Sequence, residues 1–209
     1  MKTTKISAAI LTPLMALAMA SCATTTTPAD PTSSPTASAS ASGSGGSSSM
    51  SPSEDPNGPV TGVPVDEQSA VDAGFETMKR LTAAEDKAIK SQSESIEDIK
   101  KFAKGGKLSS SQKALKQFSE KKIKQIGERK LTLIDGFARP AVGKGKKLEN
   151  RAVQLEVCQD ASTWYSVKGD KKEQPEMTRL AYNVFAEFDT DLKRWMVTEV
   201  SQGSEPKEC

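Results

Sequence analysis

Apolar residues first recur at helical spacing and later alternate with polar ones, and the change falls near residue 130. Beyond residue 66, small or apolar residues return every three or four positions: Val71, Phe75, Met78, Leu81, Ala84 and Ala88. This period predicts an amphipathic helix over about 67–91.

Two more helices are predicted before the period changes. Ser95 and Asp98 form a capping-box-like pattern that opens a short second helix, and Gly105-Gly106 is expected to end it. A third helix is predicted over about 111–128, where one apolar stripe is formed by Leu115, Phe118, Ile123 and Ile126.

The remaining part of the chain shows the period of two that is typical of strands. Alternating segments lie near 130–139, 153–157, 164–167, 180–188 and 195–198. Turns are expected at Lys168-Gly169-Asp170 and at 189–193. Helices followed by a run of strands predict an α+β domain, with the helices packed on one face of a curved antiparallel sheet.

The N-terminus has the layout of an export signal. Lys2 and Lys5 form a basic start, residues 6–20 are mostly apolar, and small residues precede Cys22. The apolar stretch is short for a transmembrane span. We therefore predict three regions: a signal peptide over 1–21, a tether over 22–65 and a folded domain over 66–209.

The segment Leu17-Ala18-Met19-Ala20-Ser21-Cys22 resembles the bacterial lipobox. That resemblance implies cleavage before Cys22 and a diacylglyceryl group on its thiol. The exported protein would then be lipid-anchored to the outer face of the cell membrane. Met19 stands where lipoboxes usually have leucine. The alternative is an ordinary secretory signal that is cleaved near Ala20, with an incidental cysteine.

The predicted tether consists mostly of Ser, Thr, Ala, Pro and Gly. Such a segment cannot bury enough apolar surface to offset the entropy lost on ordering, so we expect a disordered linker. Its mean span of about 35–40 Å would let the domain stand off from the membrane, within a layer of wall polymer.

Positive charge is concentrated in one part of the chain, although the formal net charge is only +2. Between Lys79 and Lys130 there are fifteen Lys or Arg and seven Asp or Glu. A candidate basic face is formed by Lys113, Lys116, Lys121 and Lys124. It would suit anionic wall polymer or lipid headgroups, and the alternative is an ordinary solvated helix surface. Few aromatic residues interleave with these lysines, so no nucleic-acid partner is expected.

The three cysteines are an odd number for an exported protein. If Cys22 is acylated, Cys158 and Cys209 remain as a pair, and an oxidising compartment favours a disulfide between them. The alternative is two free thiols. The chain has no histidine, which removes the commonest metal ligand and general base. We expect neither a metal site nor a cofactor.

Short motifs mark the C-terminal half of the chain. Alternating aliphatic residues lead into Cys158-Gln159-Asp160, followed by the motif residues Trp164, Gly169, Trp195-Met196-Val197 and Cys209. With the order of helices and strands, these motifs resemble small Gram-positive lipoproteins that have a cystatin-like or nuclear-transport-factor-2-like fold. The resemblance implies a pocket between the long helix and the sheet, where the candidate residues are Tyr182, Trp164, Asp135 and Glu187.

Three functions remain open at this stage. The preferred hypothesis is a non-enzymatic binding or scaffolding lipoprotein of the cell envelope, with an envelope protein or a small apolar molecule as partner. The second is a hydrolase or isomerase that uses Asp and Tyr in the pocket, although the chain has no Gly-x-Ser-x-Gly motif and we predict no catalytic residue. The third is binding of anionic wall polymer or headgroups through the basic helices.

Overall fold

The computed structural model describes residues 55, 57–143, 145–203 and 207–209, all of which belong to one compact unit. The leader, Cys22 and the predicted tether as far as residue 54 lie outside the described residues. In the described part of the chain, none of the helices combines the length and the apolar character that a membrane span requires.

The first helix, α1 (Glu67–Lys90), has nearly the bounds that its apolar period predicts. Its N-terminus is fixed by a capping box. The Asp66 carboxylate accepts a hydrogen bond from the Ser69 backbone N–H at 2.7 Å, and the Ser69 hydroxyl accepts one from the Asp66 N–H at 3.1 Å. These two bonds satisfy backbone donors that a helix start leaves free.

The second predicted helix is wrong, and the two glycines have the opposite role. Residues 95–104 contain only one 3₁₀ turn, η1 (Ile99–Lys101), and α2 (Gly105–Glu120) begins where a helix was expected to end. Backbone bonding explains this, because the Lys104 N–H donates to the Val197 carbonyl and holds the preceding residues extended. Gly105, with φ of +57°, then turns the chain into α2.

The third predicted helix is also too long at its C-terminus. Lys121 caps α2, Lys122 has a φ of +53°, and the chain then forms strand β1 (Lys124–Ile126), which pairs with β4. Ile123 and Ile126 match helical spacing, but the left-handed Lys122 ends the helix before them.

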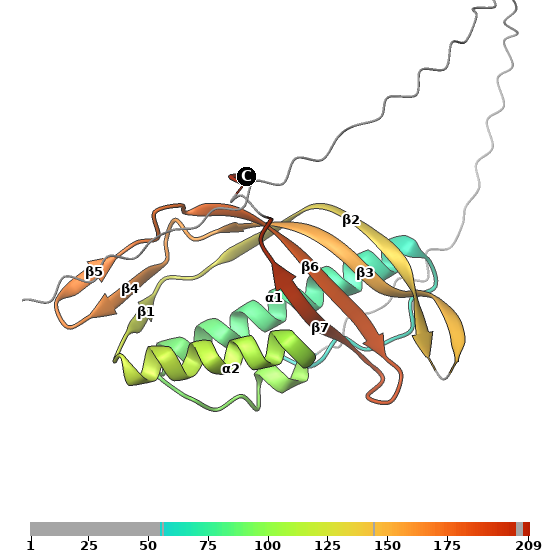
Figure 1. The fold of residues 1–209 in the computed structure, drawn as a ribbon, viewed down its shortest axis with the longest axis horizontal. Helices are drawn as coiled ribbons and strands as arrows, with labels where there is room; N and C mark the ends of the chain where they lie inside the picture. Colours follow the sequence, from blue (N-terminus) through green and yellow to red (C-terminus); the bar gives the residue numbers. More distant parts are fainter. Residues whose placement is uncertain (1–54, 56, 144, 204–206) are drawn as a thin grey trace, which may run out of the picture. The chain divides into compact units, whose positions relative to one another are not determined.

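The strands form two antiparallel sheets (Figure 1). The larger has the order β2-β3-β6-β7 and is built from β2 (Lys130–Gly143), β3 (Lys146–Asp160), β6 (Arg179–Asp189) and β7 (Arg194–Ser201). The smaller has the order β1-β4-β5, with β4 (Tyr165–Lys168) and β5 (Lys171–Glu173). The α+β class predicted from the sequence is confirmed.

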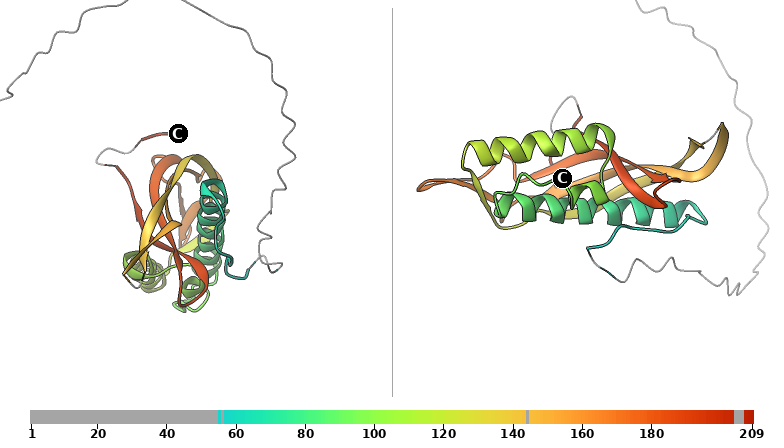
Figure 2. Two further views of the ribbon diagram at one scale, coloured as in Figure 1. Left: turned by 90° about the vertical axis from the view of Figure 1, so that its right-hand side faces the viewer. Right: turned by 90° about the horizontal axis from the view of Figure 1, so that it is seen from below.

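Both helices lie against one face of the larger sheet (Figure 2). Leu81 of α1 and Leu155 of β3 are fully buried there, and Trp195 of β7 meets Phe188 edge to face at 6.1 Å between ring centroids. Helix and sheet are so close at Gly74 that an added β-carbon would overlap Val153. Core side chains therefore fill the space between α1 and the sheet.

Residues 57–65 were assigned to the tether by composition, but part of this segment packs on the domain. Val60 is buried, its carbonyl accepts a hydrogen bond from the Trp195 N–H at 2.9 Å, and Thr61 forms a β-bridge with Arg194. The Arg80 guanidinium donates to the Gly58 carbonyl at 2.6 Å. The boundary at residue 66 is therefore too late, because one buried valine within a Pro/Gly-rich stretch leaves little trace in composition.

Candidate functional site: a basic groove over a buried charge cluster

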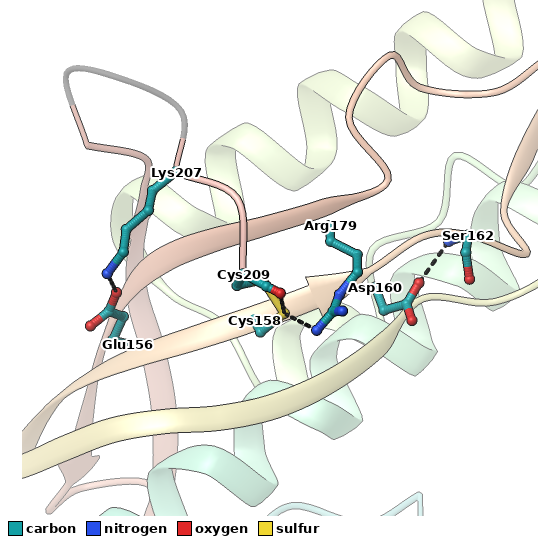
Figure 3. Close-up of a disulfide and its surroundings, with 7 residues drawn as sticks. All are labelled: Glu156, Cys158, Asp160, Ser162, Arg179, Lys207 and Cys209. Carbon is teal, nitrogen blue, oxygen red and sulfur yellow. Dashed lines mark hydrogen bonds and ion pairs between the residues drawn. A yellow bond between two sulfur atoms is a disulfide. The ribbon is translucent and has the colours of Figure 1, made fainter.

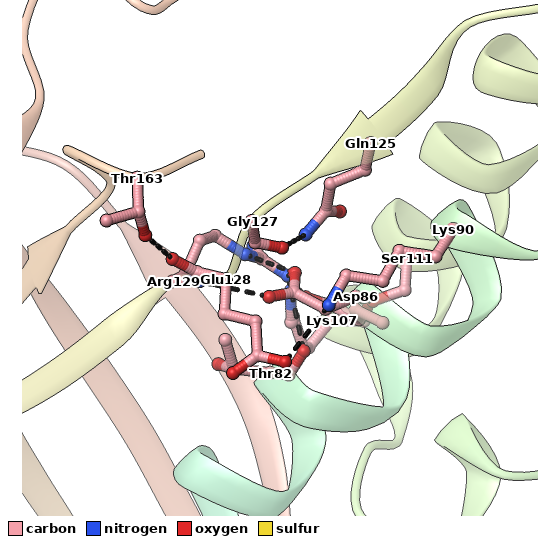
Figure 4. A network of polar contacts seen from close by, with 11 residues as sticks. Thr82, Asp86, Lys90, Lys107, Ser111, Gln125, Gly127, Glu128, Arg129 and Thr163 are labelled. Atoms are coloured by element: carbon pink, nitrogen blue, oxygen red, sulfur yellow. Dashed lines mark hydrogen bonds and ion pairs between the residues drawn. The ribbon is translucent and has the colours of Figure 1, made fainter. Parts of the chain in front are cut away.

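A cluster of charged and polar side chains is buried where α1, α2 and the start of β2 meet (Figure 4). We call it the buried charge cluster, and its members are Glu85, Asp86, Lys107, Ser111 and Arg129. α1 supplies the two acids, α2 supplies the lysine and the serine, and the arginine precedes β2.

Each carboxylate of the buried charge cluster has close partners. Glu85 accepts from Lys107 Nζ at 2.6 Å, from the Ser111 hydroxyl at 2.6 Å and from Arg129 at 3.2 Å. Asp86 accepts from Arg129 Nε at 2.7 Å and from the Arg129 backbone N–H at 3.1 Å. Buried charges with this many charge-assisted bonds fix the relative positions of the three elements.

The pKa directions agree with this pairing. Burial raises the pKa of Glu85, but the charges of Lys107 and Arg129 and the hydrogen bonds from Lys107 and Ser111 outweigh it, so the pKa lies below its ordinary value. Burial likewise lowers the pKa of Arg129, and its two acidic partners reverse the effect and raise it. Glu85 and Arg129 therefore both stay ionised at neutral pH.

A tight turn presents Arg129 to the cluster. Gly127 has a φ of +80°, its carbonyl accepts from Gln125 Nε2 at 3.2 Å, and the Thr163 hydroxyl donates to the Glu128 carbonyl at 3.1 Å. A β-carbon at Gly127 would overlap the backbone of Thr163. Only glycine fits both the left-handed backbone and the close approach.

We expect Gly127→Ala to lower the free energy of unfolding by about 2–3 kcal/mol, because left-handed strain adds to a backbone overlap. Gly169→Ala is the matched control. Gly169 also has a positive φ, of +59°, but an added β-carbon there would have no atom within 4 Å. It should lose only about 1 kcal/mol. Urea unfolding measures both, and equal losses would contradict the role of Thr163.

A groove of about 1010 Å³ lies over one side of the cluster, between the second half of α1 and the start of β2. Its charged lining residues are the cations Lys79, Lys87, Lys90, Arg129 and Lys130 and the acids Asp86 and Glu128. Both acids are already in ion pairs, Asp86 with Arg129 and Glu128 with Lys90 at 3.1 Å. The lining thus has an excess of three positive charges.

Thr82 also lines this basic groove and has an unusual environment. The residue is 2% exposed, and its hydroxyl has no hydrogen-bond partner among the described residues. The Thr82 backbone carbonyl accepts a hydrogen bond from the Arg129 guanidinium at 3.4 Å, so Thr82 and this guanidinium are neighbours. A buried hydroxyl without a partner costs free energy, and such groups are uncommon in folded proteins.

The structure pairs Cys158 of β3 with Cys209, as predicted, with an S–S distance of 2.07 Å (Figure 3). Val157 points into the core, so Cys158 points to the opposite face of the sheet, away from the helices. The C-terminal residues follow that face, because the Lys207 carbonyl accepts from the Ala181 N–H at 2.9 Å and its ammonium contacts Glu156 at 2.8 Å.

The four residues of the expected pocket have separate surroundings. Tyr182 in β6 is half-buried opposite Val157, and Trp164 packs edge to face on Phe118 at 6.5 Å.

The two acids among the four expected pocket residues do not share a site either. Asp135 is exposed beside a register shift of β2 and accepts from its neighbour Gly136 N–H at 2.8 Å. Glu187 pairs with Lys104 at 2.6 Å near β7. None of these four residues lines the basic groove.

The predicted basic face lies at the surface, as expected. Lys113 and Lys116 are on α2, Lys121 is its C-cap and Lys124 is in β1, and all four are exposed. The basic groove is a different surface, which sequence reasoning did not find. A signal for it exists, because Lys79, Ala83, Lys87 and Lys90 recur at helical spacing on one side of α1.

No cluster of His, Cys, Asp or Glu within the described ranges could hold a metal ion. Fold and groove together define a small disulfide-linked α+β domain with a cationic groove along its long helix.

Comparison with known proteins finds a likeness among solved structures. No protein-family model matches the chain, and no curated protein matches it. Among solved structures, it is similar to the intermembrane space region of the chloroplast protein ARC6, with a TM-score of 0.40 and 10% sequence identity. That match covers 68% of this chain and 100% of the other.

Proposed function

We propose that this protein is an exported lipoprotein, held to the outer face of the cell membrane by a diacylglyceryl group on Cys22, whose folded domain is a non-enzymatic binding module of the envelope. The signal-peptide layout and the lipobox-like segment before Cys22 support export and lipidation. The basic groove supplies a surface on which a ligand could be held.

The disulfide is the observation that carries the proposal. It uses two of the three cysteines, which leaves Cys22 as the remaining thiol, within the segment that resembles a lipobox. Disulfides persist in oxidising compartments outside the cytosol, so the pairing of Cys158 with Cys209 agrees with export. Two or three acyl chains on one cysteine provide a stable membrane anchor, whereas a single chain does not.

The buried charge cluster favours binding over catalysis. A general acid or base works best when its pKa lies near the operating pH. Glu85 has the opposite property, since its pKa is lowered and its carboxylate is occupied by Lys107, Ser111 and Arg129. These groups have the properties of a rigid support for the groove above them.

Cys22→Ser should release the protein from the membrane fraction, because the thiol that would carry the lipid is absent. We expect the membrane-bound share to fall at least about tenfold, since the proposed lipid is the anchor. Ser21→Ala is the matched control, because it keeps a small residue before the cysteine and should leave attachment unchanged. Fractionation and immunoblotting of the producing cells measure both variants.

Mass spectrometry of the mature N-terminal peptide tests the modification directly. The expected peptide starts at Cys22 and has the added mass of a diacylglyceryl group. An unmodified Cys22, or a mature chain that starts at another residue, would overturn the proposal.

A further inference from the structure

We propose that the basic groove along α1 binds a linear polyanion whose phosphate groups recur along a flexible chain. The inference deepens the proposed function, since it assigns a ligand class to a binding module of the envelope. Binding itself is a property of the folded domain and can be measured independently of the lipid anchor.

The arrangement of cations suits a chain better than a single ion. Lys79, Lys87 and Lys90 lie along the same side of α1, and Lys79 and Lys90 are eleven positions apart, which is about 16 Å at the helical rise. Arg129 and Lys130 stand across the groove from them, at the start of β2. A polymer that lies along the groove would thus meet positive charge on both sides over several of its repeats.

A second, smaller groove continues the positive surface on the other side of the α1 lysines. It measures about 370 Å³ and shares Lys79, Ala83 and Lys87 with the first groove. Arg80 and Lys101 add two cations to its lining, where Lys87 and Lys101 pair with the acid Asp98 and Arg80 pairs with the neighbouring Glu76. The exposed Ala83 has a short side chain, so the space between the two flanking lysines stays open along the helix.

The floor of the basic groove provides specific hydrogen-bond donors. The Thr82 hydroxyl is buried and has no partner among the described residues, and the guanidinium of Arg129 contacts the carbonyl of the same residue. A phosphate oxygen could accept from the hydroxyl and from Arg129 together. Hydrogen bonds to a charged acceptor are stronger than neutral ones, so this pair would strengthen the binding of an anionic oxygen at the floor of the groove.

The depth of these donors favours a polymer over a membrane surface. The Arg129 side chain is 19% exposed and Thr82 is almost fully buried. A planar bilayer would reach the lysines at the rim of the groove but not its floor. A flexible chain can enter the groove and reach Arg129, and a small shift of the lining side chains would bring the Thr82 hydroxyl within its reach.

The test uses the mature chain with its disulfide intact and with Cys22→Ser, so that no lipid complicates the measurement. Three probes are titrated by calorimetry and sedimentation: sodium polyphosphate, inorganic phosphate, and vesicles of phosphatidylglycerol with phosphatidylcholine. We expect polyphosphate to bind with an affinity that falls steeply with salt, and inorganic phosphate to bind at least about tenfold more weakly. The vesicles should not bind.

Two sets of variants locate the site. Lys87→Gln with Lys130→Gln should weaken polyphosphate binding at least about tenfold, because both sides of the groove lose a charge. The matched control is Lys113→Gln with Lys116→Gln, which removes the same charge from the exposed face of α2 and should change binding less than about twofold.

Thr82→Val separates binding from folding. Valine has nearly the shape of threonine and removes only a hydroxyl that lacks a partner, so the thermal midpoint should be unchanged or higher. Polyphosphate affinity should nevertheless fall about fivefold to tenfold, as the loss of one hydrogen bond to a charged group predicts.

Three outcomes would overturn the inference. One is an equal loss of binding in the two double-lysine sets, which would mean that net charge alone attracts the polymer. Another is unchanged affinity in Thr82→Val. The third is binding to the vesicles with none to polyphosphate, which would assign the groove to a lipid surface. A failure of lipid attachment at Cys22 would leave all of these measurements interpretable.

Discussion

Arg129→Met is expected to lower the free energy of unfolding by about 3–5 kcal/mol. Methionine is flexible and apolar and can fill much of the space of the arginine side chain, so the loss is one of charge and not of packing. The loss arises because Asp86 and Glu85 stay buried, with side chains that are 6% and 8% exposed, while their shared cation disappears. Asp86 would also lose its hydrogen bond from the Arg129 side chain and keep only the one from the backbone N–H of residue 129. An uncompensated carboxylate in this position is one of the few causes of such a large single-site effect.

The pH dependence of that loss is a second signature. In the wild type, the lowered pKa of Glu85 stabilises the fold above the ordinary glutamate range, and this stabilisation disappears as the pH falls through the lowered value. In Arg129→Met the Glu85 carboxylate loses one of the two cations that lower its pKa, so it takes up a proton at a higher pH than in the wild type. The difference in stability between wild type and variant should therefore shrink as the pH falls from 7 toward 4.

Arg179→Met is the control for this experiment. Arg179 is exposed on β6 and should change stability by less than about 0.5 kcal/mol. Urea unfolding followed by circular dichroism measures all three proteins at each pH. A loss in Arg129→Met that is no larger than that of the control, or that does not depend on pH, would show that the cluster does not hold α1, α2 and β2 together.

Replacing Cys158 and Cys209 together by alanine should cost about 4 kcal/mol. The bond joins residues that are 51 positions apart, and closing a loop of this length removes that much entropy from the unfolded chain. The C-terminal residues should also loosen, because the Lys207 carbonyl and its ammonium reach β6 and β3 only while the tail stays in place.

The measurement compares urea midpoints of the double variant, of the wild type, and of the wild type with reductant. The reduced wild type should behave like the variant, since both lack the cross-link. Cys22→Ser serves as the control for removing a sulfur, and its midpoint should be that of the wild type. An unchanged midpoint after reduction would mean that the cross-link adds nothing to stability.

Local periodicity identified most of the framework correctly. α1 was predictable because its apolar residues recur at helical spacing along most of its length, and β6 because apolar residues stand at every second position from Leu180 to Phe188. The errors lie where long-range pairing decides. Gly105 starts a helix because Lys104 is bonded to β7, and β1 is a strand because β4 lies beside it. Neither partner is visible in a short window of sequence.

The groove was hidden for the same reason. Lys87 and Lys130 are 43 positions apart in the chain, and Arg129 was placed just beyond a predicted helix that in fact ends at Glu120. The Thr82 hydroxyl is buried without a partner because of how α1 packs against the residues before β2, and composition cannot reveal such packing. Cysteine counting succeeded because it needs no geometry.

The two outer strands of the larger sheet have consequences for self-association. On β7, Trp195 donates to Val60 and Val197 donates to Phe102, so neighbouring segments already occupy its outer backbone groups. On β2, two register shifts and Pro140 interrupt the strand, and Glu67 accepts the Ala138 N–H. A foreign strand would find no long, regular ladder to extend on either side. Even at high local concentration, molecules of this protein should therefore not associate by edge-to-edge strand pairing.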